Sequence, residues 1–296
     1  MSKSKVYFSK EISSIKLLEL FKLVEKEKSL VGNVCVKVHS GEEGNQNYLH
    51  PEFFKEIIDY VRGTVVECNT AYGGERNTSE KHLKLLEKHN WTKYFNVDLL
   101  DEFGPDLEVL IPNGNVIKEN YLGKNIVNYD SMLVLSHFKG HPMGGYGGAL
   151  KQLAIGCASS AGKSWIHSGG YTKDQYVLWS HCAPQNRFLE AMADAALSVV
   201  DFFKGNIIYI NVMANMSVDC DCCSIAEDPC IKDIGVLIST DPVAIDKACI
   251  DLVKLSNDPG KMHFMERVTS RNGEHTIVTA EELGVGSTDY ELIEIK

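Results

Sequence analysis

Apolar and polar positions follow a repeating order along the chain. Short apolar runs, several rich in β-branched residues, occupy 34–39, 64–68, 132–135, 206–212 and 235–239. Each run is followed by a polar loop and then by a helical pattern or a cysteine-rich turn. This alternation predicts an α/β fold with a largely parallel or mixed sheet and helices on both faces. We expect a single α/β domain spanning 1–296, or alternatively two lobes around a crevice.

Capping signals mark where several helices should begin. Helices are expected over 51–62, 79–90, 148–156 and 186–203, a hairpin within 111–127, and a closing edge strand in YELIEI. Ser79 can cap the second of these helices, and Asp241 can cap a further helix that begins at Pro242. Asp246, on that last helix, is interpreted as a carboxylate that faces solvent or a partner.

The polar loops should meet at one edge of the sheet. Parallel strands send their outgoing loops to the same edge, which is where open α/β sheets bind ligands. The side chains expected near that crevice are His39, Glu42, Asn69, Tyr72, Glu75, Arg76, His137, Lys139, His141, Asp219, Cys220, Cys222 and Asp241.

A glycine-rich loop is the most unusual stretch of the chain. Five glycines fall within residues 140–148. Since each adds backbone entropy that folding must overcome, their density indicates a backbone shaped around a ligand. The helix that follows favours an anion at its N-terminus, and Lys139, Lys151 and Lys163 add positive charge. The residues predicted to bind the anion are Gly145, Gly147, Gly148, Lys151 and Arg76. The alternative is a tight turn packed against the sheet, and the spacing matches no nucleotide-binding motif.

Composition and charge narrow the partners. The chain has 296 residues, 44% of them hydrophobic, and a formal net charge of −10. This charge argues against nucleic acid and anionic membranes, so small molecules or proteins are the better partners. The partners expected are a small anionic ligand at the glycine-rich loop and, alternatively, a redox protein. The sequence contains neither a signal-like N-terminus nor an apolar run of about 18 residues, which favours a cytoplasmic protein.

A cysteine cluster is the strongest candidate for metal chemistry. The nine cysteines of the chain should be thiols or metal ligands in a reducing compartment, and Cys220, Cys222, Cys223 and Cys230 crowd into CDCCSIAEDPC. Thiolates are preferred ligands of zinc and of iron–sulfur clusters. Adjacent Cys222 and Cys223 point apart, so only one of them should join Cys220, with Cys182 or Cys230 as further ligands. The alternative is a surface loop of reduced cysteines.

Two histidines of the glycine-rich loop are candidates for catalysis. His137 and His141 are four residues apart, but Gly140 and Pro142 disfavour a helix there. As loop residues they can still converge on one point. The predicted catalytic set is His137, Lys139 and His141.

Several segments together resemble a known prokaryotic family. They are KVHSGEEGN, NTAYGGERN, SHFKGHPMGGYGGALKQLAIGCASSAGK, DCDCC and IGVLISTDPVAIDKACIDLV. The chain is similar, from about Val6 to its YELIEI tail, to the family catalogued as domain of unknown function 362, whose members are often labelled iron–sulfur-cluster-binding proteins. The resemblance implies kinship more than a defined activity.

One departure from the family bears on function. Many relatives carry ferredoxin-type cysteine quartets between the segments matching GKSWIHS and RFLEAMADAAL, where this chain has only Cys182. No C-x2-C-x2-C-x3-C-P run occurs in the sequence, so the electron-carrier label cannot be inherited. The leading hypothesis is a redox-linked metalloprotein holding zinc or an iron–sulfur cluster. The alternative is a cluster-free enzyme that acts on a small anion through His137, Lys139, His141 and Lys151.

Overall fold

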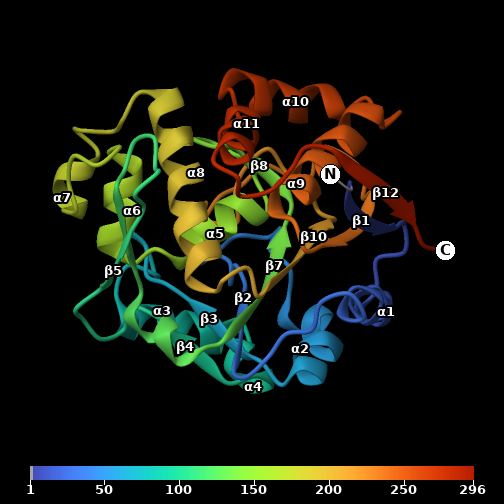
Figure 1. Ribbon diagram of the computed structural model, residues 1–296, viewed down its shortest axis with the longest axis horizontal. Helices are drawn as coiled ribbons and strands as arrows, with labels where there is room; N and C mark the ends of the chain where they lie inside the picture. The colour runs from blue at the N-terminus through green and yellow to red at the C-terminus, as the bar shows by residue number, and fades with distance from the viewer. Residues whose placement is uncertain (1–2) are drawn as a thin grey trace.

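A single mixed sheet forms the centre of the molecule. The computed structural model describes residues 3–296, and eight strands pair in the order β12-β1-β11-β10-β7-β2-β3-β4 (Figure 1). Their bounds are β1 (Ser4–Ser9), β2 (Val34–Lys37), β3 (Thr64–Glu67), β4 (Val97–Leu99), β7 (Ser131–His137), β10 (Ile207–Met213), β11 (Gly235–Ser239) and β12 (Tyr290–Glu294). The predicted α/β class with a largely parallel sheet is confirmed.

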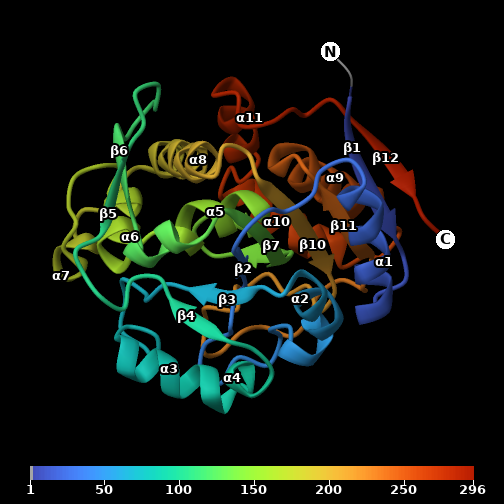
Figure 2. The ribbon, with the colours of Figure 1, turned by 60° about the horizontal axis from the view of Figure 1, so that its bottom comes forward.

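Helices cover both faces of this sheet (Figures 1 and 2). The bounds on one face are α1 (Ser14–Glu25), α2 (Lys55–Val61), α3 (Ser79–Lys88) and α4 (Trp91–Tyr94), and on the other α5 (Ala149–Cys157), α8 (Gln185–Phe202) and α9 (Pro242–Leu255). Strand β7 shows why the sheet needs helices on both faces. Met132 and Val134 pack into one hydrophobic core, while Leu133 and Leu135 pack into the other. A strand buried on both faces needs apolar residues at every position, which is the pattern of this run.

Strand direction decides which loops meet. Strands β10, β7, β2, β3 and β4 are mutually parallel, whereas β11 pairs antiparallel with both β10 and β1. Asp241 follows β11 and therefore lies at the opposite edge, where it accepts a hydrogen bond from Ser4. Its predicted place in the crevice was wrong, but its predicted capping role is confirmed by bonds from the N–H groups of Val243 and Ala244.

Peripheral elements complete the fold. Strands β5 (Leu107–Leu110) and β6 (Glu119–Leu122) form a hairpin whose first strand precedes the range predicted for it, and Thr78 rather than Ser79 caps α3. The first turn of the helix predicted from Pro51 is a 3-10 turn. The remaining bounds are η2 (Lys124–Asn128), α6 (Ser160–His167), α7 (Gln175–Leu178), α10 (Lys261–Ser270) and α11 (His275–Glu282). No helix within residues 3–296 combines the length and apolar character needed to cross a membrane.

Candidate metal centre

The glycine-rich segment folds as a small ribbon rather than an open loop. Strand β8 (Lys139–His141) pairs antiparallel with β9 (Gly145–Gly147). The N–H of Gly140 donates to the Ser217 carbonyl at 2.8 Å, and a Cβ on Gly140 would lie 2.3 Å from the Val218 carbonyl oxygen. Only glycine therefore lets β8 pack directly against the loop that leaves β10. Because side chains alternate along a strand, Lys139 and His141 share the face opposite Gly140.

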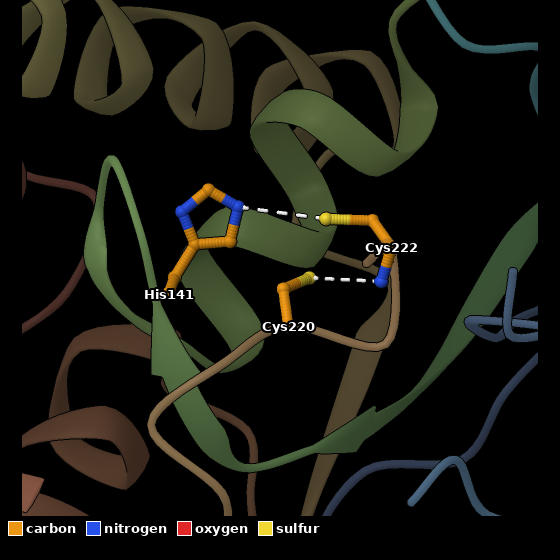
Figure 3. A group of neighbouring side chains, drawn as sticks. All are labelled: His141, Cys220 and Cys222. Atoms are coloured by element: carbon orange, nitrogen blue, oxygen red, sulfur yellow. Dashed lines mark hydrogen bonds between the residues drawn. The ribbon is translucent and has the colours of Figure 1, made fainter. Parts of the chain in front are cut away.

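His141 meets two cysteines of that loop (Figure 3). One ligand atom from each of His141, Cys220 and Cys222 lies within 4.8 Å of the other two, and His141 Nε2 is 3.9 Å from Cys222 Sγ. Cys220 and His141 are buried, while Cys222 is partly exposed. These three side chains form the candidate metal centre.

Other predicted ligands lie elsewhere. Within the described part of the chain, Cys223, Cys230 and Cys182 do not join the group. Cys182 is exposed just beyond α7, and the Cys230 thiol donates to the Met216 carbonyl. The prediction that Cys182 or Cys230 completes the site is therefore not supported by their positions, and the third donor is His141, which had been assigned to catalysis.

Three consecutive amides hold the cysteine loop in place. Asn45 Nδ2 donates to the Cys223 carbonyl at 2.8 Å, Gln46 Nε2 to the Ala226 carbonyl at 2.8 Å, and Asn47 Nδ2 to the Glu227 carbonyl at 2.8 Å. They belong to the loop after β2, so two loops from neighbouring regions of the sheet edge are tied together. Sequence analysis missed them, although a run of amide side chains in a glycine-rich loop is a signal for backbone recognition.

His137 and Lys139 are engaged by Asp221. His137 Nδ1 lies 2.9 Å from Asp221 Oδ1, its Nε2 lies 2.6 Å from the Ala214 carbonyl, and Lys139 Nζ lies 3.0 Å from Asp221 Oδ2. Burial would raise the pKa of Asp221, but the charges of His137 and Lys139 outweigh it and hold that pKa well below its usual range. Since both ring nitrogens of His137 face acceptors, neither is free for proton transfer. In this geometry His137 and Lys139 position the cysteine loop.

The N-terminus of α5 already has an anionic partner. Asp246 on α9 accepts hydrogen bonds from the N–H groups of Ala149 at 2.7 Å and Leu150 at 3.0 Å. A Cβ on Gly148 would lie 2.4 Å from the Asp246 carboxylate, so this glycine makes room for it. Burial raises the pKa of Asp246 to about 6. The sequence predicted that a bound anion would accept hydrogen bonds from this helix end. The structure differs, because the N–H groups of a buried helix N-terminus need an acceptor and Asp246 supplies it from within the fold.

A cavity of about 240 Å³ opens beside the candidate metal centre. Both His141 and Cys222 line it, as do four basic side chains, Lys37, Arg76, Lys151 and Lys163. His137, Lys139, Gly145, Gly147 and Gly148 are not among its lining residues. Of the residues predicted to bind an anion, only Arg76 and Lys151 therefore face this space.

Arg76 is held by protein groups within the cavity wall. Its Nε donates to Glu42 at 3.2 Å and its Nη2 to the Tyr72 hydroxyl at 2.9 Å. Lys37 similarly pairs with Glu67 at 2.5 Å. Lys151 is the predicted anion-binding residue that remains available, since it makes no ion pair within residues 3–296.

The donor set fits a thiophilic divalent metal. Burial raises the pKa of Cys220 to about 11. A hydrogen bond from Cys220 lowers the pKa of Cys222, but a bond with Cys223 and burial outweigh it and raise that pKa. Burial and the charge of Lys151 lower the pKa of His141 to about 4, which leaves its imidazole neutral. Two thiols and a neutral imidazole can become the Cys₂His ligand set that zinc accepts.

Comparisons with curated proteins and with solved structures give no functional assignment. No curated protein matches the chain. It is similar to the lactate racemase apoprotein from Thermoanaerobacterium thermosaccharolyticum, with a TM-score of 0.41 and 14% identity over 70% of this chain. It is also similar to a structural-genomics target from Thermotoga maritima, with a TM-score of 0.42 and 14% identity over 82% of this chain. The chain spans 50% and 59% of the lengths of those two proteins.

The family profile gives the firmest assignment. The profile described as domain of unknown function (DUF362) matches residues 34–251, which include the β8–β9 ribbon, the cysteine loop and most of α9. This match confirms the resemblance inferred from the motifs, without its iron–sulfur label. The chain therefore belongs to the DUF362 family.

Proposed function

We propose that this chain is a zinc-dependent enzyme for a small anionic substrate, with the metal held by His141, Cys220 and Cys222. The observation that carries this proposal is the convergence of the three donor atoms within 4.8 Å at the wall of a basic cavity. Such a thiol-rich centre also fits the reducing environment of the cytoplasm.

Three protein ligands favour zinc in a reactive site. Structural zinc sites are usually closed by four protein ligands, whereas catalytic sites keep one position for water or substrate. Iron–sulfur clusters usually take four thiolates, and the described residues bring only two thiols together with an imidazole. Zinc is therefore the better-supported cofactor, and the redox role with a protein partner, which the leading sequence hypothesis expects, stays a prediction.

The residues around the proposed zinc site would have separate roles in catalysis. Bound zinc would act as a Lewis acid on an oxygen of the substrate. Lys151, on α5, lines the same cavity as His141 and can bind the negative charge of the substrate. Asp221, through His137 and Lys139, keeps the cysteine loop against the ribbon that carries His141.

Metal analysis tests this proposal directly. Protein purified without oxygen and without added chelator should contain close to one zinc per chain by elemental mass spectrometry. Protein that is loaded with zinc and then dialysed should retain the bound zinc. If zinc stays far below one per chain after loading, the proposal is wrong.

The affinity for zinc should rise steeply with pH. Near neutral pH both thiols are protonated, because the pKa of Cys220 is about 11 and that of Cys222 is raised. Binding therefore releases about two protons, and the apparent association constant should increase up to about 100-fold per pH unit between pH 6 and 8. His141 adds no proton, since its pKa is about 4 and a change of tautomer conserves the count. Competition against a chromophoric chelator measures the slope, and a slope near zero would contradict thiolate ligation.

A second candidate function is favoured by the hydrogen bonds of His141. Its Nδ1 accepts from the N–H groups of Met143 at 3.1 Å and Gly144 at 2.8 Å, which leaves the ring proton on Nε2, facing Cys222. A zinc-bound histidine usually donates from its second nitrogen. The present tautomer can instead donate its Nε2–H to a Cys222 thiolate and so stabilise a nucleophilic cysteine, although the raised pKa of Cys222 acts against this role. This candidate predicts a metal-free chain, so the metal analysis separates the two.

A further inference from the structure

The cavity beside the metal centre carries uncompensated positive charge. Its Lys37 pairs with Glu67, and its Arg76 pairs with Glu42, so these charges cancel. The two lysines of the cavity lining whose charges are not cancelled in this way are Lys151 and Lys163.

Neither remaining lysine has a carboxylate partner. In residues 3–296, Lys151 has no hydrogen-bond or salt-bridge partner for its ammonium, and Lys163 Nζ donates only to the Ala158 carbonyl at 2.6 Å. Asp101 lies outside salt-bridge distance of Lys163, and its two oxygens accept N–H groups of Asn69 and Ser160. Burial lowers the pKa of Lys163, so a bound anion would restore the stability of its charged form.

A histidine in the cavity wall also has a ring nitrogen without a hydrogen-bond partner in the described part of the chain. His167 lines the cavity, and the buried Nδ1 of this histidine makes no hydrogen bond to the described residues. Its ring is fixed by stacking on Phe188, with centroids 4.6 Å apart. A buried polar atom without a partner is destabilising, and a ligand that supplies a partner recovers this cost.

Part of the lining is apolar. Met143, Ile155, Leu178 and Trp179 face the cavity, and Trp179 is 52% exposed. An inorganic ion would leave this wall without a contact. The wall instead fits the hydrocarbon or aromatic part of an organic ligand.

We propose that the cavity binds a small organic dianion with an apolar or aromatic body. Lys151 and Lys163 neutralise its two charges, His167 Nδ1 supplies a hydrogen bond, and Leu178 and Trp179 pack against its body. The inference rests on the proposed function in that it names the substrate class of the same site. The charges that select the ligand come from lysines, however, so binding should not require zinc.

Fluorescence of Trp179 gives a direct test. The dianionic probe is phenyl phosphate. Benzoate is a monoanion of similar shape, and benzamide is a neutral compound of similar shape. Each compound is titrated into the zinc-free protein at about pH 8, where a phosphate monoester carries two negative charges. Phenyl phosphate should protect Trp179 from acrylamide quenching, and Trp179→Phe should abolish the signal. Benzoate should bind about tenfold more weakly, and benzamide weaker still.

Variants separate this inference from the proposed function. Lys151→Met should weaken the binding of phenyl phosphate about tenfold or more. Lys173→Met, on the nearby loop but outside the cavity lining, should leave the affinity for phenyl phosphate unchanged. Both variants should still bind zinc. Equal affinity for phenyl phosphate and benzamide, or no effect of Lys151→Met, would overturn the dianion site even if zinc binds. Loss of zinc binding with retained phenyl phosphate binding would overturn the metal proposal alone.

Discussion

Replacing Cys222 with serine is expected to weaken zinc binding by more than about 100-fold. Changes to groups that only support a metal ligand already cost about 10–100-fold, so loss of a ligand should cost more. Cys222 is partly exposed and its side chain contacts His141 and Cys220, so the substitution should leave the fold intact. Zinc affinity is measured by chelator competition and folding by thermal denaturation.

Neighbouring cysteines supply the matched controls for this change. Cys223→Ser alters the adjacent residue, and Cys182→Ser alters an exposed thiol beyond α7, yet neither belongs to the group formed with His141. Both should bind zinc as tightly as the unaltered chain. If Cys222→Ser and Cys223→Ser bind zinc equally, the assignment of ligands is wrong.

Replacing Asp221 with asparagine is expected to produce the largest loss of stability. Asp221 is 1% exposed and faces both His137 and Lys139. Without its charge, the Lys139 ammonium would remain buried without a counter-ion, which typically costs about 3–5 kcal/mol. Because Asp221 stands between the two cysteine ligands, zinc affinity should also fall by about 10–100-fold.

Asp219 provides a comparison within the same loop. Its side chain pairs with Arg267 at 3.1 Å and is 20% exposed, so Asp219→Asn should cost no more than about 1 kcal/mol. Chemical denaturation of both variants measures the difference. Equal stability of Asp221→Asn and Asp219→Asn would contradict the role assigned to Asp221.

The sheet could be predicted because its central strands are buried on both faces. A continuous apolar run such as 132–135 has few other interpretations once a polar loop and a helix follow it. Strand direction could not be predicted, since the apolar run of β11 reads the same either way. That ambiguity is why Asp241 was assigned to the wrong edge.

The candidate site was predictable only in its local parts. The spacing of Cys220 and Cys222 indicated a metal site, whereas His141 joins them from a strand far away in the sequence. The same limit hid the carboxylate of Asp246, which takes the helix end that had been reserved for a ligand. The sequence could not show that Cys182 lies on an exposed segment beyond α7, outside the group that His141 forms with Cys220 and Cys222. The single-domain organisation stays a prediction.

X-ray absorption spectroscopy at the zinc edge tests the central claim most directly. Zinc-loaded chain should show two sulfur ligands at about 2.3 Å and one imidazole nitrogen at about 2.0 Å, with a light atom in the remaining position. The Cys222→Ser variant should lose one of the two sulfur contributions. A spectrum with only nitrogen and oxygen around the metal would contradict a zinc centre built from His141, Cys220 and Cys222.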